Sequence, residues 1–160
     1  MVIIMKIRFF SAILFLMLLF SSCGGAADAS VKIEEPMTPM MLYEQIAQTS
    51  GLPAMITLTA EELYDVIGID PAWYSESAAY FASDGTAPDE ILIFLAVDES
   101  AADALEGVLY TRLQYKQDSA EQYLTENQPM LENGVVRRDG LMVSLLVCAD
   151  MDTAEKVYQP

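Results

Sequence analysis

Two short amphipathic helices are predicted where the regular hydrophobic pattern of the chain begins. Apolar side chains recur at helical spacing over residues 40–50 and stop at Gly51. Thr59 followed three residues later by Glu62 has the form of a capping box. It opens a second helix that ends at Gly68, a typical C-terminal stop.

The remaining chain predicts two successive strand–strand–helix units. Alternating or continuous apolar runs separated by turn residues give the strands, and a helical period follows each pair. The segments beginning at Leu95 and Val147 align without a gap. The alignment indicates an internal repeat, or it arises because a helix follows each strand and needs a capping residue at the same place. The first unit has strands at 77–83 and 90–97 and a helix to about 124; the second has strands at 134–138 and 141–149 and a helix that opens with a capping box at 152–155.

These elements predict an α+β fold. Two short helices precede a four-stranded antiparallel sheet, on which the helices of the two units pack. Residues 40–160 form a single domain, and residues 23–39, which are small, polar and proline-bearing, form a flexible tether.

Residues 1–22 have the three-part layout of a signal peptide that is removed on export. Lys6 and Arg8 precede an apolar run at 9–20, and two serines follow it. Crossing a bilayer as a helix takes about 20 apolar residues, so this run is short for a permanent span. An uncleaved membrane anchor is the alternative.

The end of this leader resembles the lipobox of bacterial lipoproteins. Phe20-Ser21-Ser22-Cys23 is followed by two glycines, although the family usually has an aliphatic residue where Phe20 stands. The resemblance implies that the Cys23 sulfur carries a diacylglyceryl group, which anchors the mature chain to the outer face of the cell membrane. A disulfide between Cys23 and Cys148 is the alternative. Cys148 lies in an apolar run, which favours a buried free thiol instead.

Composition and charge exclude several functions. The chain is 53% apolar, enough for a real core, and its 24 acidic residues outnumber 8 basic ones. Nucleic acid is therefore not expected as a partner. Histidine is absent, which removes histidine-dependent catalysis and histidine-ligated metals. A surface this acidic predicts cationic partners, and we expect their association with the protein to weaken as the salt concentration rises.

Adjacent acidic residues are the first candidates for catalysis, because glycoside hydrolysis requires two carboxylates. Neighbours in sequence do not share a face of a helix or strand, so none of the pairs is a ready acid/base couple. Glu61-Glu62 and Asp98-Glu99 open predicted helices, where negative charge is favourable. We therefore expect capping and solvation, and no catalytic residue. The pairs are Glu61-Glu62, Asp89-Glu90 and Asp98-Glu99.

Calcium and copper are the metals that the residue types permit. Asp150 and Asp152 flank a predicted strand-to-helix turn that could hold calcium, although an EF-hand loop is missing. Met37, Met40 and Met41 form a thioether cluster suited to cuprous copper, with core packing as the other interpretation. No metal ligand and no cofactor is predicted, and a calcium or copper carrier stays as an alternative function.

Aromatic residues are a further candidate for binding, because exposed rings hold sugars and partner surfaces. Tyrosine is also commonly half-buried with its hydroxyl at the surface. The residues concerned are Tyr110, Tyr115 and Tyr123 on the predicted long helix, and Trp73 and Tyr74 after the proline turn.

From Tyr43 to Val157 the chain resembles the domain-of-unknown-function 4358 family, small lipoproteins of Firmicutes-type bacteria. The stretches that carry the resemblance are 51–55 (GLPAM), 63–70 (LYDVIGID), 87–94 (APDEILIF) and 131–136 (LENGVV). A departure is Asn127-Gln128-Pro129, where the family more often has a tyrosine-proline element. The resemblance implies export, lipidation and one compact domain, and it brings no catalytic residues.

Together these observations predict a lipid-anchored, extracytoplasmic, non-enzymatic module that binds or assists an envelope protein. The alternatives are a small carboxylate-dependent hydrolase or transferase acting on envelope glycan, which needs two acids converging in a cleft, and the metal carrier.

Overall fold

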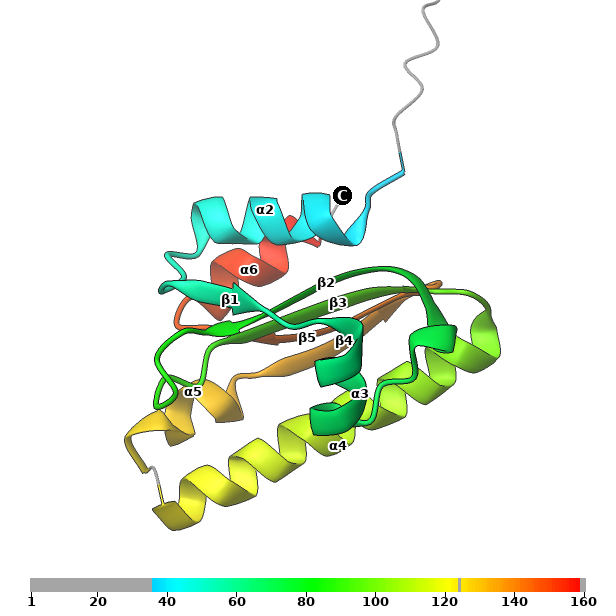
Figure 1. Ribbon diagram of the computed structural model, residues 1–160. Helices are drawn as coiled ribbons and strands as arrows, with labels where there is room; N and C mark the ends of the chain where they lie inside the picture. Colours follow the sequence, from blue (N-terminus) through cyan, green and yellow to red (C-terminus); the bar gives the residue numbers. More distant parts are fainter. Residues whose placement is uncertain (1–35, 124, 159–160) are drawn as a thin grey trace, which may run out of the picture. The chain divides into compact units, whose positions relative to one another are not determined.

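The computed structural model describes residues 36–123 and 125–158. Its elements follow the predicted order, with several short additions (Figure 1). None of the helices in these two ranges combines the length and the apolar character needed to cross a bilayer. The elements are α2 (Pro39–Thr49), β1 (Met55–Thr57), α3 (Ala60–Ile67), the 3-10 turn η1 (Pro71–Trp73), β2 (Tyr74–Ala82), β3 (Glu90–Ala96), α4 (Glu99–Tyr123), the 3-10 turn η2 (Thr125–Asn127), α5 (Gln128–Glu132), β4 (Val135–Asp139), β5 (Met142–Val147) and α6 (Met151–Val157).

The α+β class is confirmed, but the sheet has five strands where four were predicted. Its order is β1-β2-β3-β5-β4, and every neighbouring pair is antiparallel. The additional strand, β1, has three residues and pairs Ile56 with Phe81 at the edge of the sheet. A segment this short shows no alternation of its own, and only the neighbouring strand defines it.

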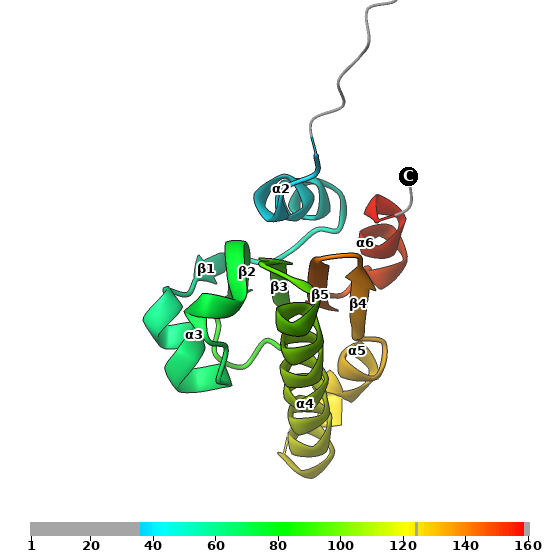
Figure 2. The same cartoon turned by 90° about the vertical axis from the view of Figure 1, so that its right-hand side faces the viewer.

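Helices cover both faces of the sheet, which explains why β3 and β5 are mostly apolar and buried on both faces (Figures 1 and 2). Leu92 and Phe94 of β3 face the core beneath α4, whereas Ile91 and Ile93 face the core beneath α2 and α6. The helices that follow the two strand pairs therefore lie on opposite faces. The two units repeat in element order only.

Local capping confirms the two N-terminal helices within a residue or two. The hydroxyl and backbone N–H of Thr59 are paired with Glu62 in a complete capping box, and Gly68 ends α3 with a φ of 86°. The predicted capping box at 152–155 is wrong, because Asp150 caps α6 by accepting a hydrogen bond from the Thr153 backbone. An aspartate one residue before the first helical turn is the better placed acceptor.

Candidate functional site

A fully buried carboxylate held by two cations is the most unusual chemical feature of the described residues. Glu90 has no exposed surface and accepts hydrogen bonds from Arg112 Nε and Nη2, both at 3.1 Å. Lys116 Nζ donates to the same carboxylate at 2.6 Å and to the Pro88 carbonyl at 2.7 Å. We call Glu90, Arg112 and Lys116 the charged cluster.

Two elements that are distant in sequence bring the charged cluster together. Glu90 is the first residue of β3, and its side chain lies on the face that α4 covers. Arg112 and Lys116 are four residues apart on α4, so both point from one side of the helix. They interrupt its apolar stripe, which continues through Leu113 to Ala120. Two basic residues on an otherwise apolar helical stripe are a sequence signal for this cluster, and the expected site residues did not include them.

Burial works against the charge on Lys116. Loss of solvation lowers the pKa of its ammonium group, although the adjacent Glu90 carboxylate acts in the opposite direction. Two of the three N–H groups on Nζ are used by Pro88 and Glu90, and Arg112 uses two of its five N–H groups on Glu90. The Glu90 carboxylate is thus hydrogen-bonded within the cluster, while Lys116 and Arg112 keep N–H groups that these bonds do not use.

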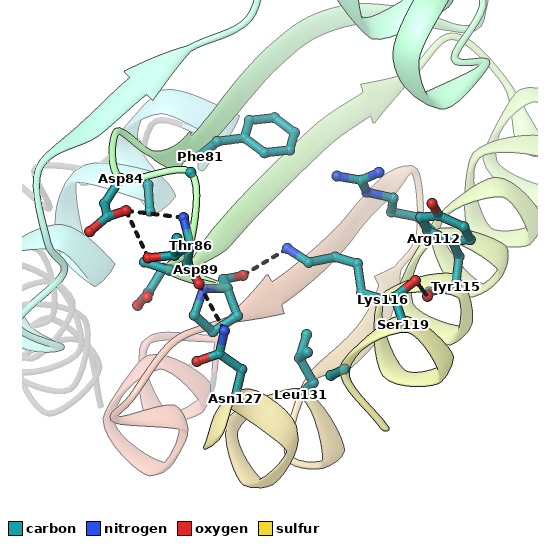
Figure 3. A pocket seen from close by; sticks show the side chains of 15 residues that line it. Phe81, Asp84, Thr86, Asp89, Arg112, Tyr115, Lys116, Ser119, Asn127 and Leu131 are labelled. Atoms are coloured by element: carbon teal, nitrogen blue, oxygen red, sulfur yellow. Dashed lines mark hydrogen bonds between the residues drawn. The ribbon is translucent and has the colours of Figure 1, made fainter. Parts of the chain in front are cut away.

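A cavity of about 280 Å³ opens beside the charged cluster, and Figure 3 shows Lys116 reaching from α4 toward the loop that forms its opposite wall. In that loop Asp84 accepts hydrogen bonds from the backbone and hydroxyl of Thr86 at 3.0 and 2.8 Å. Asn127 donates from Nδ2 to the Thr86 carbonyl at 2.8 Å. We call this cavity the polar pocket. Its other polar side chains are those of Asp89, Arg112, Tyr115 and Ser119.

The acids of the polar pocket differ in their environments. Hydrogen bonds from Thr86 lower the pKa of Asp84, which is exposed. Burial raises the pKa of Asp89, whose residue is only 6% exposed, and Lys116 partly opposes that effect. The pocket therefore presents two carboxyl groups whose pKa values shift in opposite directions, together with two basic side chains and neutral donors and acceptors.

The three acidic pairs of the sequence have different roles. Glu62 completes the capping box of α3, and Asp98 accepts a hydrogen bond from the Ala101 backbone at the start of α4. Capping is confirmed for these two. For Asp89 and Glu90 the expected solvation is wrong, because both residues are buried at the beginning of the central strand β3.

Cys148, Asp150 and Asp152 do not line the polar pocket. Cys23 lies outside the described residues. Cys148 is a free thiol that is 1% exposed, as its apolar run predicted, and burial raises its pKa to about 11. Asp150 is used as the cap of α6, and Asp152 follows it in the first turn. Within the described ranges, no group of three or more cysteine, aspartate or glutamate residues is placed to hold a metal.

The three methionines considered as copper ligands are exposed. Met37, Met40 and Met41 are 42%, 41% and 37% exposed, so they contribute little to the core. The Tyr80 hydroxyl lies 3.7 Å from Met40 Sδ. Of the aromatic candidates, Tyr115 lines the polar pocket, whereas Tyr110 is an exposed residue of α4.

The fold and the polar pocket define an α+β domain with a charged, partly enclosed cavity between its sheet and its longest helix. The family described as Domain of unknown function (DUF4358) matches residues 48–148, and the chain belongs to this family. The match contains all five strands, α3, α4 and the charged cluster, and it ends before α6. No curated protein and no solved structure matches the chain.

Proposed function

We propose that this chain is a non-enzymatic binding module of the cell envelope, anchored through Cys23 to the outer face of the membrane, with its ligand site in the polar pocket. The observation that carries the proposal is the charged cluster at the wall of that pocket. A buried ion pair gives little net stability compared with apolar residues of similar size. A few polar groups converging on a cavity are typical of a ligand site.

The hydrogen bonding of the acids favours binding over catalysis. Oε1 of Glu90 accepts a hydrogen bond from Arg112, Oε2 accepts from Arg112 and Lys116, and Asp84 accepts from Thr86. A general acid or base must be able to exchange a proton with its substrate, and these two carboxylates are already committed. The polar pocket thus has the donors and acceptors of a binding site without a pair of available acids.

Native mass spectrometry of the protein isolated from its own membranes tests the ligand site. Ser119 lines the polar pocket, so Ser119→Phe fills it, while Ser119→Ala removes only the hydroxyl and serves as the matched control. We expect a bound small molecule on the wild type and on Ser119→Ala, and its loss from Ser119→Phe. Equal occupancy of all three chains, or an empty wild type, would contradict the proposed site.

The anchor has its own test. With Cys23 acylated, the wild-type chain stays with membranes after a high-salt wash, whereas Cys23→Ala is released. Complete retention of Cys23→Ala would show that something other than an acyl group on this sulfur holds the protein.

A second candidate is a carboxylate-dependent hydrolase or transferase acting on envelope glycan. Asp89 favours it, because burial raises the pKa of this carboxyl at the wall of the polar pocket, as a general acid requires. Release of fragments from purified envelope glycan by the wild type, but not by Asp89→Asn, would support this activity over simple binding.

A further inference from the structure

A second cavity adjoins the polar pocket on the same side of the sheet. Its volume is about 790 Å³, within the range of small-molecule sites, and it lies between α4 and the segment formed by α3 and η1. We call it the α3–α4 groove. Val66 and Trp73 line it from α3 and η1, and Ala104, Gly107, Arg112 and Tyr115 line it from α4.

The body of the α3–α4 groove is apolar and open. Val66 is 62% exposed, Tyr115 is 65% exposed, and Trp73 is half-buried. On the α4 side, a Cβ atom added at Gly107 would meet no heavy atom within 4 Å. Apolar surface in a concave site is costly to leave in water, which favours an apolar occupant.

One end of this groove is cationic. Arg112 and Tyr115 line both the groove and the polar pocket, so the two cavities meet at these side chains. The guanidinium of Arg112 uses Nε and Nη2 for Glu90 and keeps further N–H groups for a second planar anion. The acid that also lines the groove, Asp103, is paired with Arg138.

The length of the groove suits a single acyl chain. From Ala104 to Tyr115 the helix advances about 16 Å at ~1.5 Å per residue. One membrane acyl chain spans roughly 15 Å, half of the ~30 Å hydrocarbon core of a bilayer.

We propose that the α3–α4 groove binds the chain of a fatty acid, whose carboxylate meets Arg112 and Lys116 where the groove joins the polar pocket. This inference rests on the proposed binding function and names the chemical class of its ligand. The preference among anionic, neutral and cationic ligands is the decisive test, because the protein as a whole has a net charge of −16 and repels anions at long range. A preference for the anionic ligand therefore requires a local cationic site.

Trp73 is the single tryptophan of the chain and lines the groove, so its fluorescence reports occupancy directly. We would titrate the full chain carrying Cys23→Ser, which has no acyl group of its own, with dodecanoate, dodecanol and dodecyltrimethylammonium. The two ions are kept below their micelle concentrations, and the alcohol is kept below its solubility limit. We expect a saturable blue shift with dodecanoate and binding at least about tenfold weaker for the other two. Equal or tighter binding of the alcohol or the cation overturns the proposal, as does no response to dodecanoate.

Two pairs of variants place the ligand. Gly107→Leu fills the groove at a helical position with room for a side chain, so it should fold as well as Gly107→Ala yet bind dodecanoate at least about tenfold more weakly. Tyr115→Ala should weaken binding, and Tyr110→Ala, an exposed tyrosine on the same helix, should not. Dodecanoate affinity that is unchanged in Gly107→Leu places the molecule elsewhere and overturns the proposal.

Failure of the fatty-acid proposal can be distinguished from failure of the proposed binding function. A polar pocket that holds a native ligand sensitive to Ser119→Phe, together with no dodecanoate binding, rejects the fatty acid and leaves the binding module. Dodecanoate binding that is insensitive to Ser119→Phe, with an empty protein from membranes, supports the groove and rejects the polar pocket as the native site.

Discussion

Replacing Lys116 by methionine is expected to destabilise the fold, because it removes one of the two cations that hold a fully buried carboxylate. Methionine retains the apolar part of the lysine side chain and lacks the ammonium group. Glu90 then loses its 2.6 Å hydrogen bond, and the Pro88 carbonyl loses its 2.7 Å one. The remaining partner, Arg112, keeps both of its hydrogen bonds at 3.1 Å.

The size of the effect follows from these contacts. A hydrogen bond between charged groups contributes about 1.5–3 kcal/mol, and a buried acceptor left without a donor costs about 1–3 kcal/mol. Burial of the ammonium, which lowers the pKa of Lys116, is relieved by the change and offsets part of this loss. We expect a net loss of about 1–3 kcal/mol, below the ~3–5 kcal/mol typical of a buried ion pair that is fully broken.

Urea unfolding followed at Trp73 measures this effect as a lower midpoint with an unchanged slope. Lys156→Met, at an exposed position on α6, is the matched control and should change stability by no more than about 0.5 kcal/mol. Replacing Glu90, Arg112 and Lys116 together by Leu, Leu and Met should recover the loss, because no buried charge remains. The reasoning is refuted if Lys116→Met is as stable as the wild type, or if the triple variant is the least stable of the set.

Three further predictions concern other parts of the domain. The folded-state pKa of Asp89 lies above its ordinary value of 3.8, so its contribution to stability is present below that value and is lost as pH rises through the raised one. Asp89→Asn should flatten the corresponding part of a plot of urea midpoint against pH, and an unchanged plot would contradict this assignment. A Cβ at Gly134 would lie 2.9 Å from Leu113 Cδ1, so Gly134→Ala should cost about 1–3 kcal/mol in urea unfolding, whereas Gly107→Ala, in open helix, should gain up to about 1 kcal/mol. Cys148 is buried with a pKa of about 11, so in the Cys23→Ser chain iodoacetamide at pH 8 should label it only in urea, and rapid labelling of that folded chain would refute its burial.

Most regular elements were predictable because their signals are local. The apolar run of β3 and the capping box at Thr59 each depend on residues close together in sequence. The three-residue β1 could not be predicted in this way, since its pairing with β2 defines it. The cap of α6 was misplaced because two aspartates, Asp150 and Asp152, compete for one position, and backbone geometry decides between them.

The candidate site was less predictable than the fold. In the sequence, Asp89 and Glu90 are indistinguishable from a solvated acidic pair. Nothing local to them indicates that Arg112 and Lys116 pack against this part of β3. Burial of a carboxylate is tolerated only where cations arrive from another element, and this is a property of packing.

By itself the sequence determined the α+β class, the order of the longer strands and helices, the strongly acidic balance, the absence of histidine chemistry and the family resemblance. The resemblance rests on matching stretches of sequence, and the other features follow from local periodicity, capping and composition. Only the tertiary structure decided that the sheet has a fifth strand, that its two faces carry different helices, and that Glu90 is buried against Arg112 and Lys116 beside a cavity. Each of these requires contact between residues distant in the chain, and such contacts are established only when the elements pack.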